Sequence, residues 1–234
     1  MNGLFITGSN TEVGKTWVSC ALIRSIRQSG VRVGAYKPVA SGVTELKDSD
    51  AFRLWKATGS CQTLEMVCPQ SFAAPLAPPL AALIEGRNVD LHLLTSGVQV
   101  WNDHCDFLIV EGAGGLLSPL TFETTNADLA VKLGLPIVIV VANQLGAVNQ
   151  SLMAYEAALA KKLRVAALVL NDPVAPIDDS DTGQHSTMIE KLLIASGRTV
   201  PPIVTFAYGQ THLILGLQCL EASRGEWAAR NPQY

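Results

Sequence analysis

Charged residues are scarce in this sequence, and they form no block of one sign. Asp, Glu, Lys and Arg together make up 16% of the residues, and the formal net charge is −3. The 17 basic residues form no dense cluster, which argues against a nucleic-acid surface, although a small patch assembled only in three dimensions would leave no such signal. We therefore expect no nucleic-acid partner.

Long apolar runs and an export signal are also missing. The longest apolar run, Leu135 to Ala142, is far too short to span a bilayer. No early segment combines a charged start, an apolar core and a small-residue cleavage site, because the first expected strand begins almost at Met1. These features lead us to expect a soluble, cytoplasmic protein without a membrane partner.

Cysteines and histidines are few, and neither shows the spacing of metal ligands. The chain has five cysteines and four histidines, without the paired spacing of a zinc site or a redox dithiol. We interpret most of the cysteines as buried small apolar residues and the histidines as surface or satisfied core residues. They are Cys20, Cys61, Cys68, Cys105, Cys219, His92, His104, His185 and His212.

Apolar sequence, in contrast, is plentiful enough for a large core. Hydrophobic residues make up 48% of the 234 residues, which suits one α/β domain spanning residues 1–234. Short β-branched runs alternate with helical stretches, and this alternation predicts a mostly parallel β-sheet with helices on both faces. Strands are expected at 4–6, 31–36, 107–110, 136–142, 165–170 and 203–206; helices are expected from 17, from about 50, at 80–85, 89–104, 150–162, 186–195 and 212–222.

Two stretches between these elements are interpreted as loops. The Pro-rich segment 61–86 is either a mobile cover over a substrate or a wrapped connection, and the connection is favoured. The segment 176–183 is expected to be an exposed acidic loop.

The strongest single motif is the glycine loop from Gly8 to Thr16, between the first strand and the first helix. Unpaired backbone N–H groups and the helix dipole make such a helix N-terminus an anion site. Lys15 is expected to reach the outer phosphates of a nucleotide, and Thr16 to ligate magnesium. Gly8 and Gly14 enclose five residues, whereas the usual phosphate loop has four. A helix-capping turn is the alternative interpretation, and the flanking strand and helix favour nucleotide binding.

Polar residues that follow the second strand extend this site. Lys37 comes directly after that strand, where ligands of open α/β sheets collect. A second cation there would help to neutralise a triphosphate; a solvated lysine is the alternative. Ser41 lies in a small-residue loop that suits close approach of a ligand. Asp50 is a possible metal carboxylate or a helix cap.

Glu111 ends the apolar run 107–110 and precedes the glycine run 112–115. An acid at the end of a strand beside a phosphate loop holds magnesium or its water shell, and the glycine run is able to present further N–H groups to phosphate. The alternative is a buried glutamate paired with a lysine. Asn171, after a later strand, either contacts a purine edge or forms a plain Asn-Asp-Pro turn with Asp172.

These motifs, taken together and in order, resemble those of the dethiobiotin synthetase family. The matching stretches are 8–16, 36–42, 110–115 and 171–172, and the resemblance runs from near Gly3 to about Asp172. The additional residue in the phosphate loop is a feature of this family. The resemblance implies a P-loop NTPase fold and a magnesium- and ATP-dependent carboligase of biotin synthesis, acting as a homodimer with sites near the subunit interface.

The resemblance also implies a reaction and a set of residues. The substrate would be 7,8-diaminononanoate, which takes up CO2 as a carbamate; ATP phosphorylates the carbamate, and the neighbouring amine closes the ureido ring, giving dethiobiotin, ADP and phosphate. The implied catalytic residues are Lys37, Lys15 and Thr11; support of the loop is the alternative role of Thr11 and of Glu12. The implied nucleotide-binding residues are Glu12, Val13, Gly14, Lys15, Thr16, Trp17, Asp50, Glu111, Gly112, Ala113, Gly114, Asn171 and Asp172. Substrate contacts are Ser41, Lys37 and Asn149, and magnesium ligands are Thr16, Asp50 and Glu111.

The chain departs from the family pattern at three places. Asn10 stands where the family usually has Asp, and Gln144 and Gln150 stand where it often has a cation and a histidine. By resemblance, the latter region binds the tail carboxylate of the substrate across the dimer. The family's proline motif beside adenine is poorly matched by 201–203.

Two other classes of protein share parts of this pattern. A partitioning-type regulatory ATPase would carry an additional lysine early in the phosphate loop and often a basic or membrane-seeking helix, and this sequence has neither. An amidating synthase of the cobyrinate type would need a glutaminase domain, for which the chain has no room.

Overall fold

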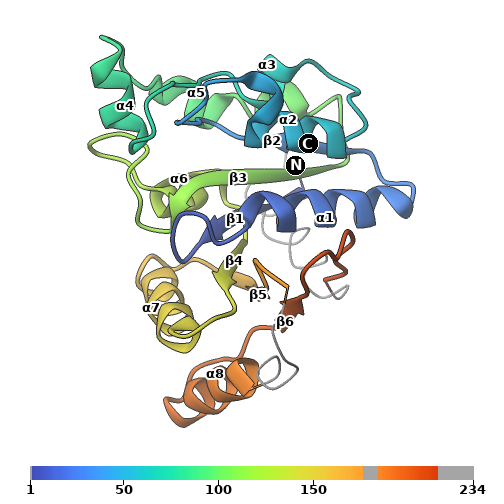
Figure 1. Ribbon diagram of the computed structural model, residues 1–234, viewed down its shortest axis with the longest axis vertical. Coiled ribbons are helices and arrows are strands. Elements are labelled where there is room, and N and C mark those ends of the chain that lie inside the picture. Colours follow the sequence, from blue (N-terminus) through green and yellow to red (C-terminus); the bar gives the residue numbers. More distant parts are fainter. Residues whose placement is uncertain (1, 176–183, 216–234) are drawn as a thin grey trace.

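The described part of the chain is organised around one six-stranded parallel sheet, which Figure 1 shows running from β2 near the top to β6 near the bottom. The computed structural model describes residues 2–175 and 184–215. The strand order is β2-β3-β1-β4-β5-β6, and each neighbouring pair is parallel. The predicted parallel α/β fold is therefore confirmed. The strands are β1 (Asn2–Gly8), β2 (Val33–Tyr36), β3 (Phe107–Gly115), β4 (Ile137–Ala142), β5 (Val165–Asn171) and β6 (Ile203–Phe206).

Helices connect the strands and cover the sheet. The connection from β1 to β2 runs toward one edge of the sheet, whereas those from β3 to β4 and from β4 to β5 run toward the other. Because crossovers between parallel strands are right-handed, α1 lies on one face, and α6 and α7 lie on the opposite face. The helices are α1 (Lys15–Gln28), α2 (Asp50–Ala57), α3 (Leu64–Val67), α4 (Pro78–Ile84), α5 (Leu91–Ser96), α6 (Asn126–Leu133), α7 (Ala147–Ala160) and α8 (Gln184–Ala195), with short 3-10 turns η1 (Leu46–Asp48) and η2 (Gln99–Trp101).

The core is built from strands that are covered on both faces of the sheet. Every residue of β4 is buried, and Leu4, Phe5 and Ile6 of β1 have no exposed surface. Such strands are continuous apolar runs rather than alternating ones, which is why the sequence located them well. Within the described ranges, no helix is long and apolar enough to span a bilayer.

The helix expected at 89–104 is wrong in its length. The structure has α5, which ends at Ser96, followed by the separate turn η2. Tyr36 packs against the end of α5: its hydroxyl donates to Leu93 O at 2.5 Å, and only a residue without a side chain fits at position 97 beside the phenol ring.

Other boundaries also differ from the predictions. Helix α7 begins three residues before Gln150 because Gly146, with φ of 96°, ends the preceding turn. The sequence pattern missed α3 and α6. Residues 212–215 are not helical: Leu213 and Leu215 are buried while Ile214 is exposed, which is the alternation of an extended segment. The rest of that predicted helix, and the predicted loop 176–183, lie outside the described residues.

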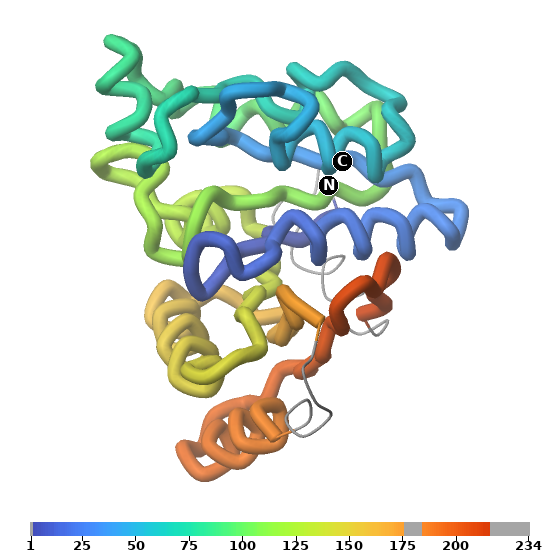
Figure 2. The backbone as a smooth tube through the Cα atoms, viewed as in Figure 1, coloured from blue at the N-terminus to red at the C-terminus, as the bar shows by residue number. Residues whose placement is uncertain are grey.

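The segment before residue 215 packs beside α1, as the red and blue parts of the tube show in Figure 2. Arg24 donates to Thr211 O at 3.4 Å, and Gln28 hydrogen bonds to His212 at 2.8 Å. These contacts join the last described residues to the helix that follows the phosphate loop.

Helix α6 begins with a capping box that generates a stability prediction. Thr125 Oγ1 accepts from the Asp128 amide, and the Asp128 carboxylate accepts from the Thr125 amide at 2.9 Å. We expect Thr125→Ala to lower the free energy of unfolding by about 1 kcal/mol, measured by urea denaturation. Thr124→Ala is the matched control, because the Thr124 hydroxyl makes no hydrogen bond within the described residues; equal losses in the two variants would contradict the prediction.

Candidate active site at the phosphate loop

The loop between β1 and α1 has the backbone geometry of an anion site. Glu12 and Gly14 adopt left-handed φ angles of 57° and 90°, and successive residues of alternating handedness bring their N–H groups together. Gly14 is the N-cap of α1 and provides no side-chain cap, so the first N–H groups of the helix are available to a ligand. A side chain at Gly14 would also collide with Asn171.

Lys15 follows this loop and is nearly buried, at 8% exposure. Its ammonium lies 3.4 Å from Asn10 O, so it folds back over the loop. Burial lowers the pKa of Lys15 below its ordinary value, and the nearby Lys37 lowers it further. A bound anion would relieve both effects, because it would replace lost solvation and offset the repulsion between the two ammonium groups.

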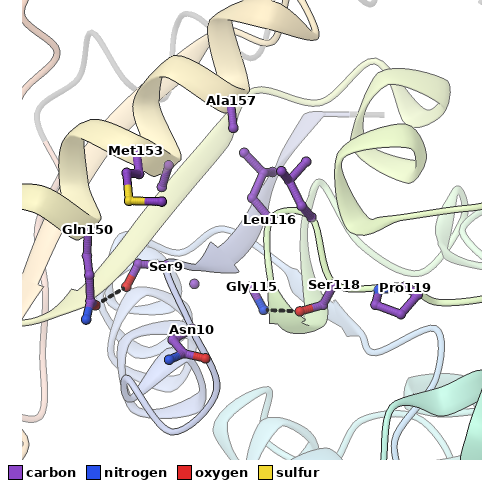
Figure 3. Close-up of a pocket in the computed structure, with 12 residues that line it drawn as sticks. Ser9, Asn10, Gly115, Leu116, Ser118, Pro119, Gln150, Met153 and Ala157 are labelled. Atoms are coloured by element: carbon purple, nitrogen blue, oxygen red, sulfur yellow. Dashed lines mark hydrogen bonds between the residues drawn. The ribbon is translucent and has the colours of Figure 1, made fainter.

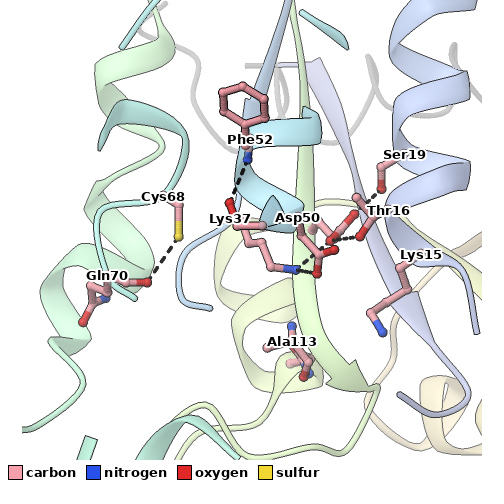
Figure 4. Close-up of polar contacts among 12 residues, drawn as sticks. Lys15, Thr16, Ser19, Lys37, Asp50, Phe52, Cys68, Gln70 and Ala113 are labelled. Carbon is pink, nitrogen blue, oxygen red and sulfur yellow. Dashed lines mark hydrogen bonds and ion pairs between the residues drawn. The ribbon is translucent and has the colours of Figure 1, made fainter. Parts of the chain in front are cut away.

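Glu111 lies inside β3 without exposed surface, and three donors surround its carboxylate. Lys37 Nζ donates to Oε1 at 2.6 Å, and Thr16 Oγ1 donates to the same oxygen at 2.9 Å. Ser19 Oγ donates to Oε2 at 2.7 Å. Asp50 Oδ2 is 3.2 Å from Lys37 Nζ. Figure 4 shows Thr16, Ser19, Lys37 and Asp50 converging from α1, the end of β2 and the start of α2.

The sheet order explains why these side chains meet. Strand β3 lies between β2 and β1, with Val110 beside Tyr36 and Glu111 beside Ile6. Lys37 therefore emerges next to Glu111, and the phosphate loop emerges on the other side. The structure extends β3 through Gly115, so Glu111 lies within the strand rather than at its end. Its burial and its pairing with Lys37 also match the alternative interpretation, a structural lysine–glutamate pair.

The charges of the cluster shift one another's ionisation. Burial alone would lower the pKa of Lys37, but Glu111 and Asp50 outweigh it and raise that pKa above its ordinary value. Lys37 lowers the pKa of Asp50. Because the folded-state pKa of Asp50 lies below its unfolded value, the associated stability is present above the unfolded pKa and is lost as the pH falls through the folded value.

The oxygen donors of this cluster fit a small hard cation. In residues 2–175 and 184–215, no group of three or more His, Cys, Asp or Glu side chains gathers that could hold a metal by itself. Thr16, Asp50 and Glu111 instead supply one hydroxyl and two carboxylates beside the anion site. Magnesium is commonly held in this way, by one or two carboxylates with phosphate oxygens and water completing the shell. The donor set therefore suits the predicted ion.

The loop that contains Lys37 and Ser41 is held by the Pro-rich segment. Lys37 N donates to Val67 O at 2.7 Å, and the amides of residues 40, 42 and 43 donate to carbonyls of residues 70, 74 and 72. The Gln70 side chain adds hydrogen bonds to Pro38 O and to both backbone groups of Asp90. The segment thus forms a wrapped connection along this loop, and Ser41 lies half-buried within it.

The glycine run after Glu111 is fixed by Asn126, which is fully buried. Asn126 Oδ1 accepts from Ala113 N at 3.1 Å, and its Nδ2 donates to Ala113 O and Gly115 O at 2.7 and 2.8 Å. Gly115 N donates to Ser118 Oγ at 2.8 Å. The amides of Ala113 and Gly115 are therefore already used within the protein, which limits the phosphate contacts predicted for this run.

Asn171, at the end of β5, contacts the back of the phosphate loop. It is 4% exposed, and its Nδ2 donates to Val13 O at 2.9 Å. The following Asp172 accepts from Asn143 Nδ2 at 2.7 Å, and Asn143 Oδ1 is 2.9 Å from His185 Nδ1. The structure therefore places Asn171 against the phosphate loop, and it adds a polar chain that the sequence did not suggest.

An apolar cavity of about 450 Å³ opens beside the phosphate loop, between the segment after β3 and α7 (Figure 3). Leu116, Leu117 and Met153 are among its lining side chains. Ser9 Oγ donates to Gln150 Oε1 at 2.9 Å across its edge. Gln150, a departure from the family pattern, thus contacts the phosphate loop directly.

Four predicted residues lie apart from the buried cluster. Thr11, Glu12, Trp17 and Asn149 are all exposed, and the Thr11 amide donates to Asn10 Oδ1 at 2.8 Å. The residues missed by the sequence analysis are Ser19, Ser118, Asn126 and Asn143. A signal existed for two of them: Ser19 is one helical turn after Thr16, and Asn126 begins the helix that the 125–128 capping box predicts.

Comparisons with known proteins found a matching family model and several relatives. A family model described as an AAA domain matches residues 2–200. An ATP-dependent dethiobiotin synthetase from Anaeromyxobacter sp. (strain Fw109-5) is 46% identical over 187 residues, covering 77% of this chain and 84% of that protein. One from Caulobacter vibrioides (strain NA1000 / CB15N) is 40% identical over 188 residues, covering 78% of this chain and 86% of that protein.

Among solved structures, pNOB8 ParA bound to nonspecific DNA aligns with a TM-score of 0.53. The alignment covers 89% of this chain and 80% of that chain, at 13% identity. At so low an identity the likeness shows a shared fold alone.

The buried ion pair predicts a large loss of stability when one partner is removed. We expect Lys37→Met to lower the free energy of unfolding by about 3 kcal/mol, because Glu111 keeps its burial and loses its cation. In the double variant with Glu111→Gln, the loss should be smaller than the sum of the two single losses. Urea denaturation of all four proteins measures this coupling.

The control is an exposed ion pair on the same protein. Lys161 contacts Asp128 at 2.7 Å with both side chains partly exposed, so Lys161→Met should cost at most about 1 kcal/mol. Additive losses at Lys37 and Glu111 would show that the pair is not energetically coupled.

Proposed function

The chain belongs to the family of ATP-dependent dethiobiotin synthetases, and from this premise we propose that it closes the ureido ring of 7,8-diaminononanoate. As a member of the family it is an ATP-dependent ligase of biotin synthesis. The proposed products are dethiobiotin, ADP and phosphate. The observation that supports this reaction best is the buried Lys37, 2.6 Å from Glu111, whose carboxylate also accepts from Thr16 at the end of the phosphate loop.

The proposed chemistry has three steps. One amine of the substrate attacks CO2 and loses a proton, which gives a carbamate. A carbamate oxygen attacks the γ-phosphorus of ATP and expels ADP, which gives a mixed anhydride. The second amine then attacks the carbonyl carbon, and phosphate leaves as the ring closes. The chain's task is to bring anionic groups together and to stabilise the charge that develops, rather than to provide a covalent nucleophile.

The two lysines divide this task. Lys15 holds the outer phosphates, since it lies over the loop at the N-terminus of α1. Lys37 lies between the γ-phosphate and the carbamate and stabilises negative charge on both. Its raised pKa, caused by Glu111 and Asp50, keeps it protonated at neutral pH. Thr11, exposed at the tip of the loop, is the third proposed catalytic residue.

The remaining roles follow from position. Thr16, Asp50 and Glu111 would hold Mg²⁺, which neutralises phosphate charge when bound. Residues 12–17 and 112–114 would line the phosphates, and Ser41 would contact the diamine. The apolar cavity beside the loop suits the alkyl chain of the substrate. Gln144 and Gln150 are neutral, so we expect them to bind the tail carboxylate of the substrate more weakly than a cation would. Asn149 is the proposed substrate contact in this region.

We also propose a homodimer with each site near the subunit interface. Leu117 is 56% exposed and Met153 is 65% exposed, and both line the cavity. Apolar side chains exposed around a binding cavity are typical of surfaces that another chain covers. The alternative, a regulatory partitioning-type ATPase, is not favoured, because the sequence relatives are synthetases.

The direct test of the function is product formation. The protein is supplied with 7,8-diaminononanoate, bicarbonate, Mg²⁺ and ATP, and dethiobiotin is detected by mass. We expect Lys37→Met to lower kcat by about 10²- to 10³-fold, as the loss of one preorganised electrostatic group does, while Lys161→Met keeps the wild-type rate. No dethiobiotin from the wild-type protein would overturn the proposed function.

A second prediction concerns the choice of nucleotide. Because Asn171 Nδ2 is bonded to Val13 O, we propose that Oδ1 meets the base and accepts from the exocyclic amine of adenine. Inosine triphosphate has a carbonyl there, so its kcat/KM should be at least about tenfold lower than that of ATP. The kcat/KM for CTP, which has an exocyclic amine, should be reduced less than the kcat/KM for UTP, which has none. Equal kcat/KM values for ATP and inosine triphosphate would refute this role of Asn171.

A further inference from the structure

Ser19 is a fully buried serine in the middle of α1, one turn after Thr16. A serine inside a helix usually faces solvent or donates to the carbonyl four residues earlier. Ser19 instead donates to Glu111 Oε2 on the neighbouring strand at 2.7 Å. Its hydroxyl is therefore directed into the charge cluster, which Figure 4 shows at the centre of the site.

The two oxygens of Glu111 have different partners. Oε1 accepts from Lys37 at 2.6 Å and from Thr16 at 2.9 Å, whereas Ser19 is the donor to Oε2. In the proposed function, Lys37 turns to the γ-phosphate and the Thr16 hydroxyl turns to the metal. Of these three donors, Ser19 alone has no other assigned partner, so it is able to keep its hydrogen bond throughout.

We propose that Ser19 is a positioning residue, which holds the Glu111 carboxylate in place for a divalent cation while Lys37 and Thr16 change partners. The proposal rests on the proposed function in assigning Glu111 to the metal. With Oε2 bonded to Ser19, Oε1 is the oxygen directed toward the ligand. Without the hydroxyl, Oε2 is buried and unsatisfied, and the carboxylate rotates away from the cation.

The position of Ser19 predicts that its loss affects the free protein and the protein bound to nucleotide and metal differently. In the free protein, Lys37 and Thr16 still hold Oε1, while the loss of Ser19 leaves Oε2 unsatisfied and lowers stability. In the protein bound to nucleotide and metal, Ser19 is the remaining anchor, so its loss weakens metal binding. A serine with a merely structural role would lower stability and leave metal affinity unchanged.

The experiment measures Mn²⁺ binding in the presence of a saturating β,γ-imido analogue of ATP, which keeps a γ-phosphoryl group for Lys37, from the loss of the free Mn²⁺ signal in electron paramagnetic resonance. We expect Ser19→Ala to weaken Mn²⁺ binding about tenfold, as the loss of an outer-shell partner does. Ser19→Cys has nearly the same volume and only a weak donor, so its Mn²⁺ affinity should lie between those of the wild type and Ser19→Ala. It also provides a folded variant if Ser19→Ala does not fold.

Ser151→Ala is the matched control. Ser151 is a helical serine with the same zero exposure, and its Oγ has no hydrogen-bond partner within the described residues. Its replacement should leave Mn²⁺ affinity within about twofold of the wild type. Unchanged Mn²⁺ affinity in both Ser19 variants, or an equal loss in Ser151→Ala, would overturn the proposal.

Dethiobiotin formation and Mn²⁺ binding, measured on the same proteins, separate this proposal from the proposed function. If the wild type makes dethiobiotin while Ser19→Ala binds Mn²⁺ normally, the role of Ser19 is wrong and the function stands. If the wild type makes no dethiobiotin but Ser19→Ala binds Mn²⁺ about tenfold more weakly, the role of Ser19 stands and the function is wrong.

Discussion

The complete burial of the Glu111 carboxylate is the constraint on which the site depends. An ionised carboxylate inside a sheet is costly unless donors and a cation surround it. Lys37, Thr16 and Ser19 satisfy this requirement from two different elements, at 2.6 to 2.9 Å. Their positions relative to one another are therefore fixed by the need to solvate one acid, before any ligand is bound.

The donors that solvate Glu111 are able to exchange this partner for a ligand. Each donor to Glu111 Oε1 is also a group that phosphate or a metal would attract, so ligand binding replaces contacts within the protein by contacts to the ligand. The same charges shift the pKa values of both lysines. Glu111 and Asp50 raise the pKa of Lys37, while burial and Lys37 lower the pKa of Lys15. Stability and affinity for anions therefore depend on the same few charges.

Neutral amides hold the loops around this charged centre. Asn126 ties together the backbone from Ala113 to Ser118, and Gln70 joins Pro38 to Asp90. A side-chain amide both donates and accepts, so one residue is able to satisfy several backbone groups of an irregular segment. These hydrogen bonds hold the backbone around Lys37 and at the glycine run in defined positions.

The sequence by itself determined the parallel sheet, the phosphate loop and the candidates Lys15, Lys37, Asp50 and Glu111. Doubly covered strands are continuous apolar runs, and the glycine loop and the polar residues at strand ends are local patterns. Only the tertiary structure decided the contacts between Ser19 and Glu111 and between Asn126 and the glycine run, the close packing at Gly97 and the cavity beside α7. Each of these depends on which strands and helices become neighbours. Ser19 and Glu111, for example, are 92 positions apart, and a contact between such distant residues leaves no periodic signal in a single sequence.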